Sequence, residues 1–288
     1  MDKECDAMSK LGYYDLGATP MAACQFDQRF PYCLYVPRGH RQGTEGTHLV
    51  VVVHGTNRTA ERYRDEFAQF AEEQNCIILA PLFPAGIVEA GDLENYKYIE
   101  YHGIRFDQIL LAMVDEVAQK YRVDTSRFLL HGFSGGGHFA HRFYYLHATR
   151  LLAVSIGAPG MITLLDADQP WYLGTRDLKE RFGTASTLPQ MRAVPVHMVV
   201  GAEDTETWEI NDTTGPRWMA GADATGPTRV ERLMALRSSY ESHGIAVGFD
   251  VLSGVAHEGY KVLEPVRDFF ASVLAAHHEI RHNSPTRH

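Results

Sequence analysis

Residues 128–138 have the sequence Phe-Leu-Leu-His-Gly-Phe-Ser-Gly-Gly-Gly-His, in which residues 132–136 match the pattern Gly-x-Ser-x-Gly. An apolar run over 128–131 precedes this pattern, and a helical pattern over about 136–147 follows it. The sequence therefore predicts a strand, a sharp turn that carries Ser134, and a helix. The outer glycines suit this turn, because side chains there would collide. The new helix would direct its first backbone N–H groups toward the serine, where they favour negative charge.

Short apolar or β-branched runs alternate with helical patterns along the rest of the chain. This alternation predicts an α/β fold with a mostly parallel central sheet and helices on both faces. The expected strands are 21–26, 31–36, 48–53, 76–79, 128–131, 152–156, 195–200 and 246–252. The first two of these are expected to form an antiparallel pair. The expected helices are 59–75, 105–121, 136–147, 228–243 and 262–276.

The predicted elements form one domain over residues 1–276, followed by a polar tail over 277–288. Two long segments, about 159–190 and 204–227, have no clear strand pattern. Loops of this length are uncommon in a compact domain unless they have a function. Both follow strands of the expected sheet, at whose carboxyl ends ligands bind. We therefore expect them to form the walls or a small lid of a pocket.

Composition excludes several classes of partner. The formal net charge is −9, so the chain has no basic footprint for nucleic acid or for an anionic membrane. Its longest apolar stretches, such as 49–53, are far shorter than the roughly 20 residues that span a bilayer. We expect neither nucleic acid nor membrane as a partner, and a homodimer is compatible with the sequence.

The four cysteines Cys5, Cys24, Cys33 and Cys76 contain no Cys-x-x-Cys pair. This pattern is typical of reduced thiols in a cytoplasmic protein. A hairpin disulfide between Cys24 and Cys33 is the alternative. The polar, acidic N-terminus lacks the basic start and apolar run of a signal peptide, which also favours a cytoplasmic location.

Ser134 needs a base within hydrogen-bond reach to act as a nucleophile. The alternative is a glycine-rich turn in which the serine only caps the helix. In known arrangements of this strand–turn–helix type, an acid and then a histidine follow the serine along the chain. Asp204 comes just after an expected strand and is our candidate acid, with Glu206 in reserve. Glu203, one residue nearer the strand, should point elsewhere.

His257 is the candidate base. It lies on a glycine-containing loop between the last expected strand and the last helix. His54 and His131 end strands and precede glycines, so packing explains them better. Three further histidines follow the serine on its helix, at spacings that do not indicate a zinc site; they are His138, His141 and His147. We expect no metal and no cofactor.

Negative charge that develops during attack by a serine needs two hydrogen-bond donors, together called an oxyanion hole. The backbone N–H of Gly135, directly after the serine, is the first candidate. The second is the backbone N–H of Thr56, in the segment Val53-His-Gly-Thr-Asn57 after an expected strand.

With these residues in place, the chain resembles the α/β-hydrolase superfamily over roughly residues 20–276. The segments His54-Gly-Thr, Gly-Phe-Ser134-Gly-Gly-Gly, Gly-Ala-Glu-Asp204 and Ala-His257-Glu are most similar to those of polyhydroxybutyrate-depolymerase-like and feruloyl-esterase-like hydrolases. The resemblance implies the α/β-hydrolase fold and metal-free hydrolysis of carboxylic esters through an acyl-enzyme. Many such hydrolases are secreted and disulfide-bonded. This chain shows neither feature, which favours a small intracellular ester over a polymer.

Aromatic side chains are the candidates for the substrate pocket. We expect Phe133, Trp171 and Trp208 to bind substrate, with Tyr96, Tyr98 and Tyr172 as further candidates. Two other functions stay open. Ser134, His257 and Asp204 would form the same catalytic triad in an amidase, peptidase or acyltransferase. The chain could also be a non-catalytic ligand-binding protein on this scaffold.

Overall fold

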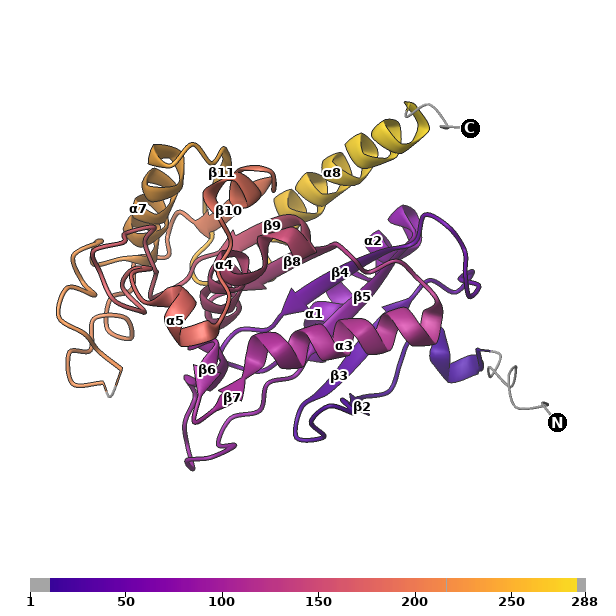
Figure 1. The fold of residues 1–288 in the computed structure, drawn as a ribbon, viewed down its shortest axis with the longest axis horizontal. Helices are drawn as coiled ribbons and strands as arrows, with labels where there is room; N and C mark the ends of the chain where they lie inside the picture. The colour runs from indigo at the N-terminus through magenta and orange to yellow at the C-terminus, as the bar shows by residue number, and fades with distance from the viewer. Residues whose placement is uncertain (1–10, 216, 284–288) are drawn as a thin grey trace.

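A mixed, mostly parallel sheet forms the centre of the molecule (Figure 1). The computed structural model describes residues 11–215 and 217–283. Hydrogen-bonded neighbours follow the order β1-β3-β5-β4-β8-β9-β10-β11, and β2 also pairs with β3. The strands are β1 (Gly17–Ala18), β2 (Ala22–Ala23), β3 (Pro31–Val36), β4 (His48–Val53), β5 (Cys76–Pro81), β8 (Phe128–Phe133), β9 (Leu151–Gly157), β10 (Val196–Gly201) and β11 (Val247–Leu252). A separate hairpin joins β6 (Glu100–Tyr101) to β7 (Ile104–Arg105).

Six neighbouring strands of the sheet are parallel, in the order β5, β4, β8, β9, β10 and β11. Strands β1, β2 and β3 are antiparallel additions at one edge. Strands β4, β5, β8 and β9 are buried along their whole lengths. Continuous burial explains their unbroken apolar sequences, because a central parallel strand is covered on both faces. Strand β11 lies at the other edge, and its residues alternate between half-buried and exposed.

Helices cover both faces of the sheet. They are α1 (Ala60–Glu66), α2 (Ala68–Gln74), α3 (Phe106–Tyr121), α4 (Gly135–His147), α5 (Leu178–Phe182), α6 (Leu188–Arg192), α7 (Arg229–Ser242) and α8 (Leu263–Asn283). Three short 3-10 helices are η1 (Tyr13–Asp15), η2 (Asn95–Tyr98) and η3 (Ala148–Arg150). In Figure 1, α3 crosses in front of the sheet and α1 lies behind it. Helix α3 buries an apolar stripe that includes Ile109, Met113 and Val117.

The expected helix over 59–75 is two helices in the structure. Helix α1 ends at Glu66 and α2 begins at Ala68. Between them, the Phe67 N–H bonds to the Arg64 carbonyl at 3.2 Å, a tight i to i−3 bond that interrupts the regular α-helical pattern.

The C-terminal helix extends beyond its predicted end at residue 276. Helix α8 continues to Asn283, so part of the expected polar tail is helical. Residues 277–283 contain no glycine or proline, and therefore nothing in their sequence stops the helix. The rest of the tail lies outside the described residues. The irregular segment 159–190 also differs from expectation, because it contains α5 and the start of α6.

Cys24, Cys33 and Cys76 are free and buried, so the prediction of reduced thiols is confirmed for them. The alternative Cys24–Cys33 disulfide is wrong. Cys5 lies outside the described residues. Across residues 11–215 and 217–283, no helix is both long and apolar enough to cross a membrane.

Asp107 makes a buried ionic contact in the first turn of α3. Its carboxylate accepts hydrogen bonds from Arg105 at 2.7 and 2.8 Å and lies 2.7 Å from His147 Nε2. Burial alone would raise the pKa of Asp107, but the hydrogen bonds from His147 and Arg105 outweigh it and lower the pKa to about 2. The contact joins the start of α3 to the end of α4, the helix that follows Ser134.

We predict that Asp107→Asn lowers the free energy of unfolding by about 2 kcal/mol at neutral pH, because it leaves two half-buried donors without their buried anion. The folded-state pKa lies below the unfolded value, so this contribution is present above about pH 4 and is lost as the pH falls toward 2. Urea unfolding at pH 7 and pH 3 measures it. Asp115→Asn, on the exposed side of the same helix, is the control. Equal losses in the two variants, or a loss that does not change with pH, would contradict the prediction.

Candidate active site

Ser134 lies at the turn between β8 and α4, as predicted. Its backbone has φ 57° and ψ −117°, a conformation that residues other than glycine rarely adopt. The Ser134 N–H donates to the Gly157 carbonyl at 2.8 Å, and its own carbonyl accepts from the His138 N–H at 3.0 Å. These bonds to β9 and α4 hold the serine in its strained conformation.

The glycines around Ser134 allow close contact between backbones. A Cβ on Gly132 would overlap the Gly136 carbonyl, and a Cβ on Gly136 would overlap the Val53 carbonyl at the end of β4. The collisions expected from the sequence therefore involve backbone atoms, which cannot move aside as a flexible side chain can.

The structure brings Ser134, His257 and Asp204 into one line of hydrogen bonds. His257 Nε2 lies 2.9 Å from Ser134 Oγ, and His257 Nδ1 lies 2.6 Å from Asp204 Oδ2. The three residues follow β8, β10 and β11, so they meet at the carboxyl edge of the sheet. The Asp204 side chain is fully buried, whereas 27% of the His257 side chain is exposed.

This geometry determines which nitrogen of His257 carries the proton. A carboxylate can only accept, so Nδ1 must donate to Asp204, and the lone pair of Nε2 then faces the Ser134 hydroxyl. The hydroxyl can donate to Nε2, which is the arrangement needed for proton removal from a serine.

Asp204 has a second partner that sequence reasoning missed. Arg229, the first residue of α7, is 3% exposed and lies with Nη1 3.4 Å from Asp204 Oδ1. Its Nη2 pairs with Glu209. The two reserve acids lie elsewhere, because Glu206 accepts a hydrogen bond from Trp208 Nε1 and Glu203 is exposed.

A second line of Ser, His and Asp side chains crosses the sheet away from this site. Ser155 Oγ lies 2.9 Å from His197 Nδ1, and His197 Nε2 lies 3.0 Å from Asp250 Oδ2. His131 Nδ1 lies 3.1 Å from the same Ser155 hydroxyl. Ser155 is fully buried within β9 and has a regular strand backbone, so its hydroxyl cannot reach a substrate. We interpret this second line as a polar contact that links neighbouring strands.

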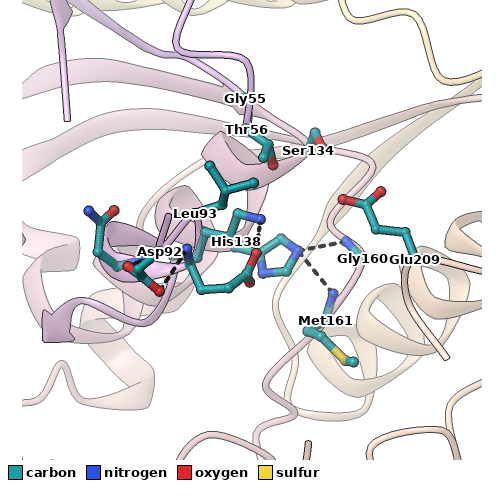
Figure 2. Close-up of polar contacts among 12 residues, drawn as sticks. Gly55, Thr56, Asp92, Leu93, Ser134, His138, Gly160, Met161 and Glu209 are labelled. Atoms are coloured by element: carbon teal, nitrogen blue, oxygen red, sulfur yellow. Dashed lines mark hydrogen bonds and ion pairs between the residues drawn. The ribbon is translucent and has the colours of Figure 1, made fainter. Parts of the chain in front are cut away.

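The two candidate oxyanion donors lie beside Ser134. Figure 2 shows Gly55 and Thr56 next to the serine. A Cβ built on Gly135 would lie 3.3 Å from the Thr56 backbone nitrogen, so the two residues are close neighbours. A Cβ on Gly55 would likewise lie 3.5 Å from Ser134 Cβ.

A cavity of about 240 Å³ opens beside Ser134. Both long irregular segments contribute to its wall. The first contributes Gly160 and Met161, and the second contributes Glu209, Ile210, Asp212, Gly215, Arg217 and Trp218. Figure 2 shows His138, Gly160, Met161 and Glu209 around this side of the serine. Charged side chains are prominent in the lining; they are Glu94, Lys97, Glu209, Asp212, Arg217 and Arg229.

The three aromatic residues predicted to bind substrate, Phe133, Trp171 and Trp208, do not line this cavity. Phe133 packs beside the His257 ring, with ring centroids 4.9 Å apart, and supports the histidine. Trp171 is buried against Phe182, and Trp208 is 73% exposed. Of the aromatic candidates, Tyr98 lines the cavity. The sequence indicated aromatic anchors because large apolar side chains are common in pockets, but Phe133, Trp171 and Trp208 are absent from this lining.

Comparison with known proteins identifies the fold. No family model and no curated protein matches the sequence. Among solved structures, the chain is similar to LpqC, a poly(3-hydroxybutyrate) depolymerase from Bordetella parapertussis, with a TM-score of 0.66 and 22% identity over 86% of this chain and 87% of that one. Poly(aspartic acid) hydrolase-1 from Sphingomonas sp. KT-1 matches with a TM-score of 0.66 and 19% identity over 90% and 96%. An S-formylglutathione hydrolase from Agrobacterium tumefaciens matches with a TM-score of 0.57 and 13% identity over 93% and 98%. The chain has the α/β-hydrolase fold that its strand order and its strand–turn–helix serine indicated.

Proposed function

We propose that this protein is a serine hydrolase that cleaves small carboxylic esters through an acyl-enzyme. The observation that carries the proposal is the line of hydrogen bonds from Ser134 through His257 to the buried Asp204. A ligand-binding protein without activity has no need for a strained serine, an oriented imidazole and a buried carboxylate in one line. A cavity beside the serine gives the acyl carbon a place to bind.

The reaction would proceed in two halves. His257 Nε2 takes the proton of Ser134 as Oγ bonds to the acyl carbon, and Asp204 stabilises the imidazolium. The backbone N–H groups of Gly135 and Thr56 donate to the oxyanion. The C–O bond to the alcohol then breaks, and the alcohol leaves with the proton from His257. A water molecule attacks the acyl-enzyme in the same way, and the acid leaves as Ser134 regains its proton.

Two further observations support a small ester. The cavity volume of about 240 Å³ is below the range typical for drug-sized ligands, which favours a short acyl or alcohol group. The similar solved structures include a ferulic acid esterase and an S-formylglutathione hydrolase, as well as the depolymerase. No observation on this chain favours an amide, so the amidase, peptidase and acyltransferase functions remain alternatives for the test below.

The two lines of Ser, His and Asp provide a matched test of the nucleophile. We predict that Ser134→Ala lowers ester turnover by roughly six orders of magnitude and abolishes labelling by a fluorophosphonate. Ser155→Ala should keep both, because its hydroxyl only bridges two buried histidines. Labelling followed by mass spectrometry measures this. Retained labelling in Ser134→Ala would contradict the proposed nucleophile.

The same comparison applies to the acid. Asp204→Asn should lower kcat by about 10⁴, because an amide no longer fixes the proton on Nδ1 of His257. Asp250→Asn, which alters the corresponding contact of His197, should stay near wild type. Steady-state kinetics of both variants decide the point. An Asp204→Asn enzyme with near-normal activity would contradict the assignment of Asp204 as the acid.

Ester preference is tested with paired substrates. We predict hydrolysis of short-chain 4-nitrophenyl esters and much slower hydrolysis of the matching 4-nitroanilides, because an amide needs protonation of a poorer leaving group. Release of the chromophore measures both. Activity on the anilides alone would replace the esterase with an amidase.

A further inference from the structure

Three cationic and three anionic side chains line the cavity beside Ser134, in a chain that carries a formal charge of −9. Two fully buried arginines lie directly behind the cavity wall. Arg142 donates to the Lys97 carbonyl at 2.7 Å, and Arg232 donates to the Ile210 carbonyl at 3.0 Å. Within the described residues, neither arginine makes an ion pair with a carboxylate, and each is held by hydrogen bonds instead, Arg142 to Thr163 and Arg232 to Asn211.

The lining holds three carboxylates and three cations, and two ion pairs leave Asp212 and Arg217 without an oppositely charged partner among the side chains that the structure describes. Glu94 pairs with Lys97 at 2.6 Å, and Glu209 pairs with Arg229. Asp212, the third acid of the lining, accepts hydrogen bonds from the backbone and hydroxyl of Thr214. The carboxylates of the lining are therefore engaged.

Arg217 is the remaining cation. Its guanidinium lies over the rings of Tyr98 and Tyr101, with the Cζ atom 5.1 and 4.8 Å from their centroids. Between residues 11 and 283, leaving aside position 216, no carboxylate forms an ion pair with it. Stacking on aromatic faces holds a guanidinium in place and leaves the N–H groups on its edge free for a ligand.

Two buried N–H groups of the lining also have no acceptor in the part of the chain that the structure describes. They are Nε of Arg229, a residue that is 3% exposed, and Nε1 of Trp218. Both groups can only donate. An unpaired buried donor costs free energy until a ligand supplies an acceptor. The described part of the cavity lining thus contains two N–H donors without an acceptor and one guanidinium without an ion-pair partner.

We propose, building on the hydrolase function above, that this cavity binds a carboxylate on the substrate, with Arg217 as its ion-pair partner. A carboxylate supplies both the negative charge and the acceptor oxygens that the lining lacks, and its two oxygens match the paired N–H groups of a guanidinium. A neutral polar substrate would supply acceptors but would leave the charge of Arg217 unmatched. The substrate class is therefore an ester that carries a free carboxylate on its acyl or its alcohol part.

Carboxylate and carboxamide substrates of equal size test this proposal. On the acyl side, mono-(4-nitrophenyl) glutarate is compared with the 4-nitrophenyl ester of glutaric acid monoamide. On the alcohol side, 4-acetoxybenzoate is compared with 4-acetoxybenzamide. The wild-type protein should favour the carboxylate in one pair by about tenfold in kcat/KM, the effect of one partly desolvated ion pair. The pair that shows the preference identifies the part of the substrate that enters the cavity.

Arg217→Gln should remove this preference, because it should raise KM much more for the carboxylate substrate than for the carboxamide substrate. Arg41→Gln removes the same charge from an exposed position before the amino end of β4 and should change neither. Equal rates on both members of both pairs, or a preference that survives in Arg217→Gln, would overturn the proposal.

A binding measurement separates this proposal from the proposed hydrolysis. Ser134→Ala protein is titrated with monomethyl glutarate, 4-methoxybenzoate and their carboxamide counterparts in a calorimeter, without any turnover. Tighter binding of a carboxylate that Arg217→Gln abolishes would support the proposal even if no ester is cleaved. Equal binding within both pairs would reject it even if ester hydrolysis is observed.

Discussion

The first turn of α4 packs directly against the backbones of β4, β8 and β9, and the rest of the site depends on this contact. Side chains at Gly132, Gly136 and Gly137 would overlap carbonyl groups of α4, β4 and β9, respectively. Glycine at these positions lets the helix begin within one residue of the strand. The turn is tight enough to hold Ser134 at a positive φ, with its hydroxyl facing His257 at the carboxyl edge of the sheet.

The acid and the base are held by a second close contact, between the loops that follow β10 and β11. A side chain on Gly201 would overlap the Val255 carbonyl, so these loops touch through their backbones. Asp204 is thereby buried against His257, with Arg229 on its other side. Arg229 also pairs with Glu209 in the cavity wall. A single guanidinium therefore contacts both the buried acid behind His257 and a carboxylate of the cavity lining.

Most of the sheet and the line from Ser134 to Asp204 could be predicted from the sequence, because each of these residues follows an apolar strand at a fixed position along the chain. The cavity could not be predicted in the same way. Arg217 and Trp218 lie in an irregular segment without periodicity, and an arginine in sequence is normally a solvated surface residue. Only the folded chain shows which cations are buried and which have partners. Trp208 illustrates the opposite error, since its side chain is exposed.

The proposed function requires Ser134 as the nucleophile and the neighbouring backbone N–H groups as donors to the oxyanion. A crystal structure of the protein after reaction with a small alkyl phosphonate tests both roles together. We expect a covalent bond between phosphorus and Ser134 Oγ, with the phosphoryl oxygen within about 3 Å of the backbone nitrogens of Gly135 and Thr56. A phosphonate bound to another residue, or a phosphoryl oxygen that faces away from both nitrogens, would contradict this expectation.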